Sequence, residues 1–143
     1  MQLTFHAEEI DFELEEASKI DRWLKSVIKN ENWILAAVTY IFCSDAYLYQ
    51  MNVEHLQHDT YTDVITFQYN EEFVEGDIFI SIERTNENAQ TFGVSSSHEL
   101  HRVMVHGLLH LMGYKDKEPA DKKLMTEKEN EYLELLKPIL ALS

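Results

Sequence analysis

Residues 97–112 form an apolar segment of helical length, and this segment constrains the fold more than any other part of the chain. Ser96 and Glu99 have the spacing of a capping box, in which each side chain satisfies a free backbone N–H at the start of a helix. Gly113 stands where a left-handed residue ends many helices. The apolar residues between these ends cover most of the helix circumference: Leu100, Val103, Met104, Val105, Leu108, Leu109, Leu111 and Met112. A helix with this pattern is expected to be buried on several sides.

One narrow polar stripe runs along this helix and contains Glu99, Arg102, His106 and His110. His106 and His110 are one turn apart, about 6 Å at their base, so their two imidazoles can bind one metal ion. Asp116 follows the glycine exit by three residues and can fold back as a third ligand. The pattern H-x3-H-x5-D therefore predicts a metal site with one position open to water. Two satisfied core histidines beside a solvated loop aspartate are the structural alternative.

The sequence HGLLHLMGYKD at 106–116 resembles the signature of the YbeY family of bacterial rRNA-maturation factors, which are metal-dependent endoribonucleases. The segments TDVITF at 62–67 and GDIFIS at 76–81 resemble the same family in the expected order. The family usually has a third histidine where this chain has Asp116. The resemblance implies a metal site in a cleft between the central helix and the sheet, and it makes Thr62 and Asp63 candidates for substrate binding.

The resemblance also implies the substrate and the partners. The substrate would be rRNA, and the partners would be the small ribosomal subunit, one of its proteins and an assembly GTPase, with neither DNA nor a membrane involved. A ribosome-assembly factor whose metal is structural, and which binds RNA without cutting it, is the alternative from another functional class.

The residue after the first histidine bears on the chemistry. Helical HxxxH also suggests a zincin protease, but those enzymes need a glutamate where this chain has Gly107. The catalytic group is then metal-bound water, with no side chain assigned as a base. Either a hydroxide on the metal or an activated 2′-OH of the RNA could be the nucleophile. The aspartate ligand leaves zinc as the first choice of ion, with nickel, manganese or iron as alternatives.

The net charge of −14, from 26 acidic and 12 basic residues, is unusual for a protein that acts on RNA. A local basic patch or a partner must therefore present the substrate. Family members usually have an arginine shortly before the TDV segment, and this chain has none there. Arg102, on the metal-site stripe, is the candidate for phosphate contact, with an ion pair to Glu99 as the alternative. His58 is a weaker substitute, and His98 and His101 are expected to be solvated.

The rest of the pattern predicts one metallohydrolase-like domain over residues 1–143. Strands are expected at 2–6, 33–43, 62–69 and 78–82, and helices near 14–28, 46–56, 83–92, 97–112 and after Pro119. The fold class is α+β (α/β-like), with a four-stranded mixed sheet and about five helices, of which the central one is buried and carries the metal ligands. A lone Cys43 and the absence of a signal peptide or an apolar span of membrane length favour the cytoplasm.

Overall fold

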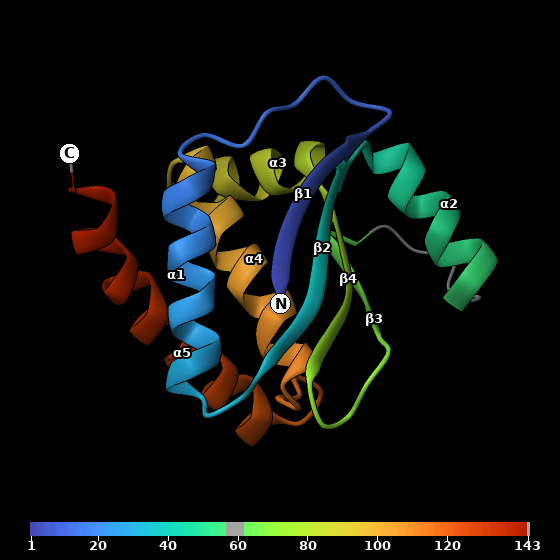
Figure 1. Ribbon diagram of the computed structural model, residues 1–143. Coiled ribbons are helices and arrows are strands. Elements are labelled where there is room, and N and C mark those ends of the chain that lie inside the picture. Colours follow the sequence, from blue (N-terminus) through green and yellow to red (C-terminus); the bar gives the residue numbers. More distant parts are fainter. Residues whose placement is uncertain (57–61, 143) are drawn as a thin grey trace.

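The structure is a computed structural model that describes residues 1–56 and 62–142 (Figure 1). The candidate residue His58 lies outside the described residues. Within them the elements follow in this order: β1 (Gln2–Glu8), α1 (Ala17–Asn30), β2 (Leu35–Cys43), α2 (Asp45–Leu56), β3 (Val64–Gln68), β4 (Val74–Ser81), α3 (Ile82–Phe92), α4 (Ser96–Leu111) and α5 (Pro119–Leu140). This is the predicted α+β fold.

The four strands form one mixed sheet in the order β1-β2-β4-β3. Strand β2 pairs in parallel with β1 and β4, because helices connect β1 to β2 and lie between β2 and β4 in the chain. Strand β3 pairs antiparallel with β4 through a short hairpin. In that hairpin the side-chain oxygen of Asn70 accepts hydrogen bonds from the backbone N–H groups of Glu72 (2.7 Å) and Phe73 (3.1 Å). The prediction of a four-stranded mixed sheet is confirmed.

The two faces of the sheet are covered unequally. Helices α1, α3, α4 and α5 lie on one side and α2 lies on the other (Figure 1). Along β4 the side chains of Val74, Ile78 and Ile80 alternate toward the larger group of helices and are fully buried. On the opposite face Cys43 and Ile65 of the sheet form a small second cluster with Leu48 of α2. The main core is therefore the layer between the sheet and α4.

Helix α4 contacts the sheet closely because residue 107 has no side chain. A Cβ atom on Gly107 would lie 2.8 Å from Cγ2 of Ile78, which is closer than carbon atoms normally approach. On its other sides α4 packs against α3 and α5, so the predicted burial on several sides is confirmed. Gly113 has a φ of 94° and forms the predicted left-handed exit. Among the described residues, no helix combines the length and apolar content needed to cross a membrane.

The start of α4 differs from the prediction. Ser95, one residue before the predicted cap, accepts a hydrogen bond at its Oγ from the backbone N–H of His98 (3.0 Å). Glu99 takes no part in a capping box, and its side chain is buried, with 4% exposed. His101, predicted to be solvated, lies edge-on to the ring of Trp23 at 6.0 Å, and burial lowers its pKa to about 4. Tertiary neighbours from α1 decide this outcome.

Candidate metal centre

Three side-chain atoms converge beside the C-terminal half of α4. Nε2 of His106 and Nε2 of His110 are 3.0 Å apart, and Oδ2 of Asp116 lies 3.3 Å from each of them. Ligand atoms about 2.1 Å from a tetrahedral ion are about 3.4 Å from one another. The three atoms therefore have the spacing of three ligands of a single ion. All three residues are only half-buried, so a fourth position remains accessible.

The other ring nitrogen of each histidine is held by an acceptor. Nδ1 of His106 lies 2.6 Å from a carboxylate oxygen of Glu129, and Nδ1 of His110 lies 2.9 Å from the main-chain carbonyl of Tyr114. A carbonyl oxygen can only accept, so Nδ1 of His110 donates its proton and Nε2 keeps a lone pair directed at the common centre. Acceptors of this kind fix the orientation of metal-binding histidines.

Glu129 is a functional residue that the sequence analysis missed. It lies on the buried stripe of α5, between Met125 and Tyr132, and is only 7% exposed. A glutamate within an apolar helical stripe was the available signal, because an ionised side chain is seldom buried without a partner. Here it has two partners, since Nη1 of Arg102 donates to its other oxygen (2.8 Å) while His106 occupies the first.

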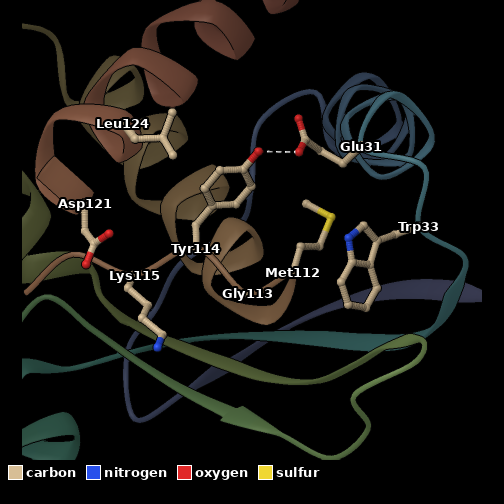
Figure 2. A pocket seen from close by; sticks show the side chains of 8 residues that line it. All are labelled: Glu31, Trp33, Met112, Gly113, Tyr114, Lys115, Asp121 and Leu124. Carbon is tan, nitrogen blue, oxygen red and sulfur yellow. Dashed lines mark hydrogen bonds between the residues drawn. The ribbon is translucent and has the colours of Figure 1, made fainter.

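Tyr114 is fixed at its other end by a buried acid (Figure 2). Its hydroxyl donates to Oε1 of Glu31 (2.6 Å), and Oε2 of Glu31 accepts hydrogen bonds from Lys128 (3.2 Å) and from the hydroxyl of Tyr132. Burial raises the pKa of Glu31, but these three hydrogen bonds outweigh burial and lower it. An ionised Glu31 therefore ties the loop after α4 to α1 and α5.

The pKa values of His106 and His110 are shifted in opposite directions. Burial lowers the pKa of His106, but the hydrogen bond and charge of Glu129, with the charges of Asp116 and Asp63, outweigh burial and raise it. Burial and the neighbouring His106 lower the pKa of His110. His106 thus binds a proton more readily than an ordinary histidine and His110 less readily, because two positive charges so close together would repel each other. A divalent cation would compete with that proton, so its affinity must rise with pH.

The centre opens into an acidic cleft of about 280 Å³. Asp63, Glu99 and Arg102 line it together with His106, Asp116 and Glu129. Burial raises the pKa of Asp63 and of Glu99. Thr62 instead donates its hydroxyl to the carbonyl of Val64 (3.4 Å) and is not among the described residues lining the cleft.

Arg102 does not form the ion pair with Glu99 that the sequence offered as an alternative to a phosphate contact. It pairs with Glu129 and donates from Nη2 to the side-chain oxygen of Asn130 (2.8 Å), so the alternative of an ion pair with Glu99 is wrong. Its side chain remains 27% exposed within the cleft, which leaves N–H groups free to meet an anion.

Gly107 occupies the position of the zincin glutamate and is directed at the sheet. The space beyond its Cα is filled by Ile78 and Thr66, so no acidic side chain could fit there. The general base of a zincin-type protease is therefore absent for a geometric reason.

The chain is similar to proteins of one family over most of its length. A profile of the family described as Endoribonuclease YbeY matches residues 2–137. A protein of that description from Flavobacterium psychrophilum is 52% identical over 128 residues, covering 89% of this chain and 91% of that protein. Another, from Cytophaga hutchinsonii, is 47% identical over 135 residues, covering 93% and 94%. The solution structure of TM1509 from Thermotoga maritima is similar with a TM-score of 0.69 at 29% identity, and the match covers 94% of this chain and 88% of that one.

Proposed function

This chain belongs to the endoribonuclease YbeY family, and on that basis we propose that it hydrolyses phosphodiester bonds of ribosomal RNA at the centre formed by His106, His110 and Asp116. The observation that carries this proposal is the convergence of three ligand atoms 3.0–3.3 Å apart, each histidine held by a separate acceptor. We treat residues 1–143 as one domain that performs this reaction.

The donor set fits a divalent metal ion. Two imidazole nitrogens and one carboxylate oxygen suit zinc first, with nickel, manganese or iron as alternatives. A divalent ion supplies Lewis acidity, which makes an oxygen nucleophile available near neutral pH and offsets charge on the phosphate. The half-buried ligands and the open cleft favour a catalytic ion over a structural one, because structural sites are closed by four protein ligands.

The chain's own residues divide the remaining work. Glu129 and the carbonyl of Tyr114 hold the Nδ1 protons and so keep both Nε2 atoms directed at the centre. Arg102 positions Glu129 and is the only arginine or lysine among the described residues lining the cleft, so we assign it the phosphate contact. Asp63 lies in the same cleft, where its carboxyl could contact a ribose hydroxyl.

The location and the partners follow from the same proposal. We place the protein in the cytoplasm, acting in rRNA maturation on the small ribosomal subunit, with a small-subunit ribosomal protein or an assembly GTPase as partner. The net charge of −14 supports dependence on a partner, because such a chain repels naked RNA over most of its surface.

The decisive experiment is cleavage of single-stranded rRNA segments by metal-loaded protein, with and without chelator, on naked RNA and on ribosomal particles. The wild type should cut in a chelator-sensitive manner, and better on particles. Arg102→Ala should lose cleavage on both substrates, with Arg102→Lys in between. Metal content must be measured alongside, since loss of Arg102 also releases Glu129. Undiminished cleavage by metal-replete Arg102→Ala would leave Arg102 with no role in substrate binding.

A further inference from the structure

A second pocket shares the loop that carries Asp116 (Figure 2). Its volume is about 380 Å³, larger than the cleft of the metal centre, and the roles described above leave it without a ligand. The pocket lies between the start of β2, the residues after α4 and the first turns of α5.

The walls of this pocket are aromatic and apolar. Trp33 packs against the main core on one side and is only half-buried, so the rest of its ring faces the pocket. Tyr114 stands across from it, with Met112 between them and Leu124 at the rim (Figure 2). Leu124 is 44% exposed. A flat, weakly polar molecule fits such walls.

Two polar features point to the kind of molecule. Within the described part of the chain, the indole N–H of Trp33 has no hydrogen-bond partner, so it is free to donate to a ligand. Glu31 and Asp121 both line the pocket. Lys128 and two tyrosine hydroxyls neutralise Glu31, and Lys115 in the same lining supplies one positive charge against Asp121. The pocket therefore carries little unbalanced negative charge that would repel an anionic molecule.

Lys115 lines the pocket and begins the densest group of lysines in the chain. Lys115, Lys117, Lys122 and Lys123 are exposed, and they supply four of the 12 basic residues within the segment 115–123. None of the four forms an ion pair with a described residue. Aromatic walls next to unpaired lysines are the arrangement by which proteins bind single-stranded nucleic acid, through stacked bases and paired phosphates.

The pocket is also close to the metal centre. Tyr114 contributes its ring to the pocket and its carbonyl to His110, and Asp116 follows only two residues later. Consecutive Cα atoms are about 3.8 Å apart, so the Cα atoms of Tyr114 and Asp116 are within about 7.6 Å.

We propose that this pocket binds one nucleobase of the RNA substrate, close to the bond that is cleaved. The base stacks on the ring of Trp33, the indole N–H donates in the plane of that ring to a sugar or phosphate oxygen of the same strand, and a phosphate lies against Lys115. This inference rests on the proposed function for the identity of the ligand. The pocket then supplies the local affinity for RNA that the chain's overall charge denies.

The test is fluorescence of a short single-stranded RNA with one 2-aminopurine, titrated with full-length protein in the presence of chelator, so that no cleavage occurs. Stacking on Trp33 should quench the 2-aminopurine. Trp33→Leu should abolish the quenching and weaken binding about tenfold, the usual effect of losing one stacked base. Phe92→Leu is the matched control, since Phe92 is 63% exposed at the end of α3, and it should bind like the wild type.

A second pair of variants tests the lysines without altering the wall. Lys115→Gln should weaken binding about threefold and reduce its salt dependence, because one phosphate contact is lost. Lys137→Gln, which removes an exposed lysine from the pair with Glu134, should change neither. Lys115 is exposed and unpaired, so this variant should fold even if Trp33→Leu is destabilised.

The outcomes separate this inference from the proposed function. If the wild type cleaves RNA with metal but Trp33→Leu and Lys115→Gln bind and quench like the wild type, the pocket is not a base site and the nuclease assignment stands. If quenching depends on Trp33 but metal-loaded protein never cleaves, the base site stands and the proposed function fails. If an apolar peptide displaces the RNA from Trp33 at lower concentration than a mononucleotide does, the pocket is a protein-docking site and the inference is overturned.

Discussion

The two ends of α4 place the same residue type in opposite circumstances. At the C-terminal end, His106 and His110 face α5 and the loop after α4, where Glu129 and the carbonyl of Tyr114 accept their Nδ1 protons. At the N-terminal end, His101 faces the ring of Trp23, and burial lowers its pKa to about 4. In this helix the two histidines whose Nδ1 atoms meet an acceptor converge with Asp116, whereas the histidine that meets an indole ring packs beside that ring.

The charges around the two ends differ in the same sense. Residues 8–16 contain six carboxylates and no lysine or arginine, and they contribute to a groove beside the first turns of α4. Residues 115–123, beyond the other end, contain four lysines against three carboxylates, Asp116, Glu118 and Asp121. About ten residues of helix, roughly 15 Å, lie between the two regions. The net charge of the whole chain therefore does not describe the local charge at each end of α4.

The largest effect is expected when a histidine at one end of α4 is replaced by alanine and compared with the same replacement at the other end. His110→Ala should lose the bound metal and reduce cleavage by more than about a hundredfold, because one ligand of three is removed. His101→Ala should keep both metal and cleavage. Metal analysis and cleavage rates of the two purified variants decide the matter, and equal metal loss in both would remove the distinction between the two ends.

A smaller effect is expected from the acceptor alone. Glu129→Gln preserves size but removes the charge that holds Nδ1 of His106, and it should weaken metal affinity by about 10–100-fold. The control is Glu134→Gln on the same helix, whose partner Lys137 is exposed. Competition against a chelator of known affinity measures both, and a wild-type affinity for Glu129→Gln would mean that His106 needs no acceptor.

His101 predicts the acid sensitivity of the N-terminal end. Its pKa is about 4 when folded, below the value of about 6.5 expected when unfolded, so the unfolded chain binds the proton first as pH falls. The contribution of His101 to the free energy of unfolding is fully present above about pH 6.5 and is lost as the pH falls from about 6.5 to about 4. Because the ring is partly exposed, we expect this loss to be on the order of 1–2 kcal/mol.

His101→Phe keeps a ring against Trp23 and removes the titrating group, so its stability should fall less over that range than that of the wild type. His6→Phe, on exposed edge strand β1, serves as the control. Urea unfolding at a series of pH values measures the difference. His98 and Glu16 also act on His101, and parallel curves for wild type and His101→Phe would assign the acid sensitivity to other groups.

The smallest expected change comes from exchanging one ligand for another. Asp116→His restores the ligand usual in the family and adds about one positive charge to the centre. Metal preference should shift toward zinc, and the midpoint of the pH–rate profile should fall by about one unit or less. Unchanged selectivity together with an unchanged profile would refute the electrostatic account of Asp116.

The sequence was sufficient where the information is local. The spacing of His106 and His110 and the glycine exit predicted three atoms that do converge, and alternating strands predicted the mixed sheet. It was insufficient where a partner comes from a distant element. Glu129 contacts His106 only because α5 docks in one register, and the ring of His101 is partly buried by Trp23, which lies 78 residues earlier in the chain.

The close contact at Gly107 also affects how the chain is made. The strands that α4 covers are complete at Ser81, whereas α4 ends at Leu111, about 30 residues later. At ribosomal rates of about 5–20 residues per second, synthesis of α4 is complete about 1.5–6 seconds after that of β4, and the apolar face of β4 is not covered by α4 during this time. A bulkier residue at 107 would impede the docking of α4 and so prolong that exposure. We therefore expect such a variant to aggregate during synthesis before any loss of activity is detected.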